Sequence, residues 1–163
     1  MTTAESKHLG PIAFDEGLGG GVVDAAVPFS GAALAVHVRI DFPERFNDTV
    51  VKDIDMTLDN LEFVDNLARQ TIEEGLQKDS STSAQLYKAW EKHKPIGRDD
   101  ATADFLSQLT PAQIAIMPDG GRDQPVRVDM TYGFVNSPVT GKITVRFLEP
   151  TGPQLAPAPA GGY

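Results

Sequence analysis

The sequence predicts an α+β domain in which antiparallel strands pack against two or three central helices. Three observations predict it. Apolar residues alternate with a period of two within residues 9–42, recur every three or four residues within 56–109, and alternate again within 113–148. Because strands and helices occur in separate runs, this order favours α+β over a doubly wound parallel sheet.

The N-terminal strand group contains residues 9–14, 22–29 and 33–42. The third is the clearest strand, because every second residue is a large apolar one: Leu34, Val36, Val38, Ile40 and Phe42. The glycine-rich stretch at 15–21 is either a phosphate-binding loop or a turn. It lacks the Gly-Lys-Ser/Thr signature and is followed by β-branched residues rather than a helix start, so it predicts a turn between the first two strands.

Helical spacing appears in residues 56–78, 83–94 and 100–109, with Asp55 or Thr57 as the expected cap of the first helix. Trp90 shares a helix face with Leu86, which predicts that it is buried.

Strand periodicity then returns at 113–117, 126–134 and 142–148, separated by turn-rich segments. These three strands predict an antiparallel meander. We expect residues 1–8 to be an N-terminal extension, residues 9–149 to be a single domain, and residues 150–163 to be a flexible tail of proline, alanine and glycine.

Composition narrows the classes of function. The 163 residues include 14 Lys and Arg against 23 Asp and Glu, a net charge of −9, which argues against nucleic-acid binding and suits a basic protein partner. No apolar run approaches 18 residues, so no membrane association is predicted. The start of the sequence lacks a secretion signal and the chain has no cysteine, which together indicate a cytoplasmic protein.

No motif predicts a catalytic, cofactor-binding or metal-binding residue. The histidines His8, His37 and His93 lack metal-ligand spacing and are expected on the surface. Asp53, Asp55, Thr57 and Asp59 imitate the first positions of a calcium loop. However, Leu58 and Val64 occupy the positions where that loop needs glycine and glutamate.

The chain also resembles small bacterial proteins of the toxin-immunity type. The resemblance rests on a Pro-Phe-Ser-Gly turn at 28–31 leading into an alternating strand, a Pro-x-x-Ile-x-Ile strand from Pro111, and a final Gly-x-Ile-x-Val-x-Phe strand from Gly141. It covers about residues 9–149 and implies an α+β fold and a protein partner, with no catalytic residue to carry over.

These observations favour a non-enzymatic binding module, for instance an immunity-like protein that neutralises a basic partner. The candidate partner-binding residues form an acidic group in the first helical region: Asp53, Asp55, Asp59, Glu62 and Asp65. Two alternatives stay open. The chain is a structural subunit of a phage particle or secretion apparatus, with contacts between its own copies, or it is an enzyme whose site is assembled only by folding.

Overall fold

The computed structural model describes residues 2–14, 21–42, 46–93, 101–119, 126–135, 137–148 and 152–163. Within them the chain forms a two-stranded sheet, a six-stranded sheet and four helices, which confirms the predicted α+β class. None of the helices in these ranges is long and apolar enough to cross a membrane.

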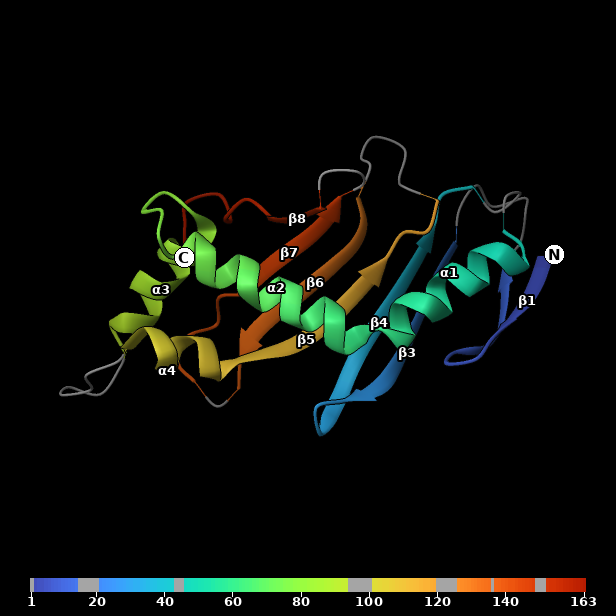
Figure 1. Cartoon of the computed structure of the whole chain (residues 1–163), viewed down its shortest axis with the longest axis horizontal. Helices are drawn as coiled ribbons and strands as arrows, with labels where there is room; N and C mark the ends of the chain where they lie inside the picture. The colour runs from blue at the N-terminus through green and yellow to red at the C-terminus, as the bar shows by residue number, and fades with distance from the viewer. Residues whose placement is uncertain are drawn as a thin grey trace.

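The large sheet runs across most of the molecule (Figure 1). Its strands, in spatial order, are β3 (Gly21–Phe29), β4 (Ala32–Ile40), β5 (Leu109–Ile116), β6 (Val126–Phe134), β7 (Ile143–Leu148) and β8 (Gly152–Leu155). Neighbouring strands are antiparallel except β4 and β5, which are parallel. The predicted meander is therefore confirmed as β5–β6–β7, and the parallel pair joins it to β3 and β4 in one sheet. The first strand of the predicted N-terminal group, 9–14, instead belongs to the two-stranded sheet.

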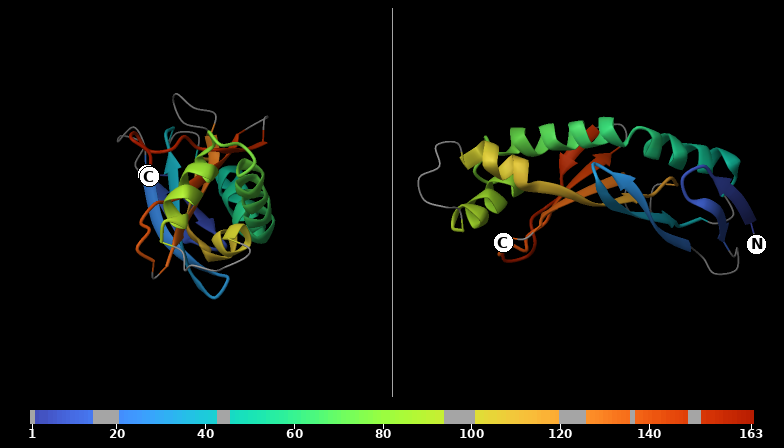
Figure 2. Two further views of the ribbon diagram at one scale, coloured as in Figure 1. Left: turned by 90° about the vertical axis from the view of Figure 1, so that its left-hand side faces the viewer. Right: turned by 90° about the horizontal axis from the view of Figure 1, so that it is seen from below.

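The helices connect β4 to β5 and lie on one face of the sheet (Figure 2). They are α1 (Asp48–Asp59), α2 (Leu61–Gly75), α3 (Thr82–Glu91) and α4 (Ala101–Gln108). A parallel pair needs a long crossover of this kind, because a tight turn cannot bring the chain back to the start of the next strand.

The core lies between the helices and the sheet. The alternation predicted for β4 is confirmed, since Leu34, Val36, Val38 and Ile40 are all buried. From the helices, the buried side chains include Val51, Ile54, Leu58, Ile72, Leu86 and Phe105. Trp90 is also buried, as predicted, with its ring centroid 5.6 Å from that of Phe105.

The first helix begins earlier than predicted. Asn47 is its N-cap and accepts a hydrogen bond from the Val50 amide (3.1 Å), so α1 starts at Asp48 rather than near Asp55. The chain then breaks at Asn60 before α2, so the predicted single helix is two. The helical spacing does extend to these first turns, since Val51, Ile54 and Leu58 follow one another at steps of three and four and are all buried, but the prediction began only at Met56.

Residues 1–8 do not form a separate extension. Thr2–Ser6 is strand β1, which pairs antiparallel with β2 (Gly10–Phe14) in a hairpin that packs against α1. The correction has a physical cause: polar residues make the outer strand, while Ile12 of β2 is buried in the core. Of the predicted glycine turn at 15–21, residues 15–20 lie outside the described residues, and Gly21 begins β3.

The C-terminal segment is also placed differently. Gly152–Leu155 forms β8, and the buried Ala156 follows it, with its carbonyl accepting a hydrogen bond from Thr82 Oγ1 (2.6 Å). Tyr163 donates from its hydroxyl to the carbonyl of Lys142 (2.7 Å). The described part of the predicted flexible tail is thus attached to the sheet and α3 by hydrogen bonds that composition does not reveal.

The face of the sheet turned away from the helices carries a transverse row of polar side chains. Cross-strand register aligns Asp24, His37, Asp129 and Arg146 on this face, with the small Ala115 between His37 and Asp129. His37 hydrogen-bonds to Asp24 across the strands, and Asp129 lies 3.7 Å from Arg146. Burial raises the pKa of Asp129, and Arg146 offsets part of that rise.

The β3–β4 hairpin generates a prediction. Its two turn residues, Ser30 and Gly31, both have positive φ (52° and 79°), as a type I′ turn requires. We expect Ser30→Asn to raise the free energy of unfolding by about 0.5 kcal/mol, because the left-handed backbone costs an ordinary residue about 1–2 kcal/mol and asparagine less. Urea denaturation measures it, with Ser30→Val as a control that should be destabilising. Equal midpoints for all three proteins would contradict the turn assignment.

Candidate functional site

Helices α1 and α2 follow one another along the sheet (Figure 2). Their sequence is strongly acidic. Residues 48–75 contain eight acidic and two basic side chains. All five residues predicted to bind a partner lie in this stretch. The structure separates them into three environments, because some of them are held by contacts within the chain.

Asp55 and Asp59 hold the β1–β2 hairpin against α1. Asp55 accepts hydrogen bonds from Ser6 Oγ (2.6 Å) and the Lys7 amide (2.9 Å). Asp59 accepts from Lys7 Nζ (3.0 Å) and lies 2.7 Å from His8 Nε2. These two carboxylates therefore cap the turn of the hairpin, and Asp59, whose side chain is 43% exposed, is more open to solvent than the half-buried Asp55.

Asp65 is buried beneath α2 in a polar network. It accepts a 2.5 Å hydrogen bond from the Tyr132 hydroxyl of β6 and hydrogen bonds of 3.1 and 3.2 Å from Arg69 Nε. The Arg69 guanidinium also donates to the carbonyls of Leu106 (3.4 Å) and Leu109 (3.1 Å). Burial and the bond to Asp65 raise the pKa of Tyr132 above its usual range, so the hydroxyl remains a donor.

Asp53 and Glu62 remain on the exposed outer surface, where two large apolar side chains accompany them. Met56 is 60% exposed and Phe63 is 63% exposed, each opposite the buried side of its helix. We call these four residues the outer face. The sequence analysis missed both apolar residues, although a signal was present: neither of them belongs to the apolar spacing that predicted the buried sides.

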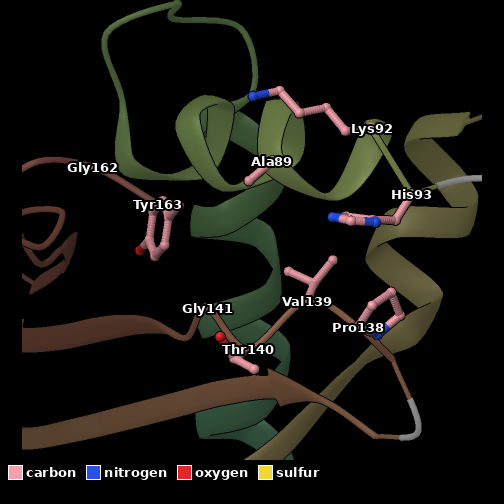
Figure 3. Close-up of a pocket in the computed structure, with 9 residues that line it drawn as sticks. All are labelled: Ala89, Lys92, His93, Pro138, Val139, Thr140, Gly141, Gly162 and Tyr163. Carbon is pink, nitrogen blue, oxygen red and sulfur yellow. The ribbon is translucent and has the colours of Figure 1, made fainter.

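A cavity of about 450 Å³ lies at the end of α3, closed by the loop at 138–141 and the C-terminal residues (Figure 3). The His93 ring points into it above Val139, with Tyr163 on the opposite wall. Tyr163 packs closely on Gly141, where a Cβ would lie 2.8 Å from its ring. Among the described residues, none forms a hydrogen bond with the His93 ring.

A smaller slot of about 300 Å³ lies between α2 and α4. Its walls are Arg69, Ile72 and Glu73 of α2, with Leu106, Ser107 and Leu109 opposite.

The three histidines lie in different parts of the molecule. His8 is in the hairpin turn, His37 is on the open sheet face and His93 borders the cavity. Among the residues whose structure is described, no group of three or more His, Asp or Glu side chains is placed to hold a metal ion.

The buried network generates a prediction. Tyr132→Phe removes a hydrogen bond to a carboxylate, and bonds to charged groups contribute about 1.5–3 kcal/mol, so the free energy of unfolding should fall by that amount. The matched control is Tyr163→Phe, which removes a bond to a neutral carbonyl and should cost about 1 kcal/mol. Urea denaturation compares them. A larger loss for Tyr163→Phe would contradict the role given to the network.

The hairpin contact should depend on pH. Hydrogen bonds from Lys7 and His8 lower the pKa of Asp59. Its stabilisation is therefore complete above the ordinary pKa of aspartate and is lost as the pH falls through the lowered value. We expect amide-exchange protection of β1 and β2 to fall over that range, and to be weaker at neutral pH in Asp59→Asn. The control, Asp53→Asn, should leave it unchanged, and equal losses in both variants would overturn the assignment.

Comparison with protein-family models, with curated proteins and with solved structures gives no match.

Proposed function

We propose that this chain is a non-enzymatic module that binds a basic protein partner through the outer face of α1 and α2. The observation that carries the proposal is the pair of exposed apolar side chains, Met56 and Phe63, in the middle of an acidic surface. Neither side chain contributes to the core, so the fold gives no reason for its size or apolarity.

The arrangement suits recognition of a cationic surface. Aromatic residues and methionine are enriched where proteins bind one another, and the surrounding acidic residues would steer a basic partner toward them. Asp53 and Glu62 have no side-chain partner among the described residues, so their charge is available. By contrast, Asp55, Asp59 and Asp65 already bind groups within the chain. Neutralisation of a basic toxin, the role that the immunity-like resemblance implies, is one form of this function.

The test is capture of a partner from the native host, followed by measurement of the purified pair. We expect Asp53→Lys with Glu62→Lys to weaken binding about tenfold at low salt, because each exposed charge pair contributes about 0.2–1 kcal/mol and reversal replaces attraction with repulsion. The variant should also flatten the dependence of association on salt.

Two further variants make this test specific. Met56→Ser with Phe63→Ser should weaken binding while leaving the free energy of unfolding nearly unchanged, since both side chains are exposed. The control is Glu5→Lys with Glu91→Lys, which reverses two exposed charges outside α1 and α2. Equal binding by wild type and both outer-face variants would contradict the proposal.

A further inference from the structure

The slot between α2 and α4 is an apolar recess in an otherwise polar flank of α2. Ile72 and Leu109 are buried, and Leu106 is partly buried and packs against the core. A volume of about 300 Å³ is at the lower end of ligand pockets, which suits one large side chain rather than a whole cofactor.

Arg69 forms one wall and is held rigidly. Its guanidinium carbon lies 5.1 Å from the centroid of the Tyr132 ring, and its nitrogens donate to Asp65, Leu106 and Leu109. Its charge is thus compensated, while the side chain remains 36% exposed beside the slot. A fixed guanidinium plane with its hydrogen bonds already made favours contact with an aromatic ring.

Glu73 supplies the only acidic side chain among the described residues that line the slot. It is exposed and has no side-chain hydrogen bond or ion pair within the described part of the chain. Its carboxylate is therefore free to pair with a cation that lies next to a group in the slot.

We propose that the slot binds an aromatic side chain of a basic partner segment, with the ring against Leu106 and Arg69, above the buried Ile72, and a neighbouring lysine or arginine paired with Glu73. The inference rests on the proposed function and defines the partner more narrowly, as a segment in which an aromatic residue stands beside a basic one. Buried aromatic anchors of this kind dominate binding at protein interfaces.

The full chain, labelled at its isoleucine and leucine methyl groups, is titrated with the amide-capped dipeptide N-acetyl-Phe-Lys-amide and followed by NMR. We expect saturable shifts of the Ile72, Leu106 and Leu109 methyls with a millimolar dissociation constant, as is usual for so few buried atoms. N-acetyl-Phe-Glu-amide should bind about two- to fivefold more weakly, because an exposed ion pair contributes little. N-acetyl-Ala-Lys-amide should cause no saturable shift.

Variants link the shifts to the slot. Glu73→Gln should remove the preference for Phe-Lys over Phe-Glu, and Ser107→Phe should abolish the shifts by placing a ring of the chain itself at the opening. The control is Glu74→Gln, the next residue along α2, which lines a different hollow with Gly75, Lys78 and Leu155. It should behave as wild type.

Absence of saturable shifts with Phe-Lys, or equal binding of Ala-Lys, would overturn the proposal. Retention of the shifts in Ser107→Phe would do so as well. The titration contains no partner protein, so its failure is distinct from failure of the proposed function. If the peptide binds while the outer-face variants leave partner binding intact, the proposal for the slot is supported and the proposal for the outer face is overturned.

Discussion

The hydrogen bonds among Asp65, Arg69 and Tyr132 fix the position of α2 on the sheet. The rest of the helical layer depends on that position. A buried carboxylate is costly to desolvate unless it is paired, and here it receives bonds from both a hydroxyl of β6 and the guanidinium of its own helix. The same guanidinium then binds the carbonyls of Leu106 and Leu109, where α4 passes directly into β5. One network therefore sets the rotation of α2 and its position over the sheet and against α4.

That rotation determines which side of α2 faces solvent. With Asp65, Ala68 and Ile72 inward, Phe63 and Glu62 have to point outward. It also forms the slot, because the distance between α2 and α4 is set by Arg69 reaching across to the α4–β5 junction. The two surfaces proposed to bind a partner are consequences of the same buried contact.

The acidic residues of α1 and α2 show how one composition serves several roles. Asp55 and Asp59 replace the hydrogen bonds that the hairpin turn would otherwise make with water, and Asp65 organises the core. Asp53, Glu62 and Glu73 make no such side-chain contacts within the described chain and leave their charge at the surface. The net charge of the chain therefore overstates how much negative charge a partner can meet. Burial and pairing within the chain decide which carboxylates remain available at the surface.

The fold class and most strands were determined by the sequence alone, because a period of two in β4 and β7 follows directly from one buried and one exposed face. The acidic region was also evident, since charge and helical spacing are local properties. The parallel β4–β5 pair was decided only by the tertiary structure, because pairing between segments some seventy residues apart leaves no local periodicity. The tertiary structure alone likewise decided the pairing of β1 and β8 and the different environments of Asp53, Asp55 and Asp65. Each depends on a partner distant in the chain, such as Tyr132 for Asp65 or Ser6 for Asp55.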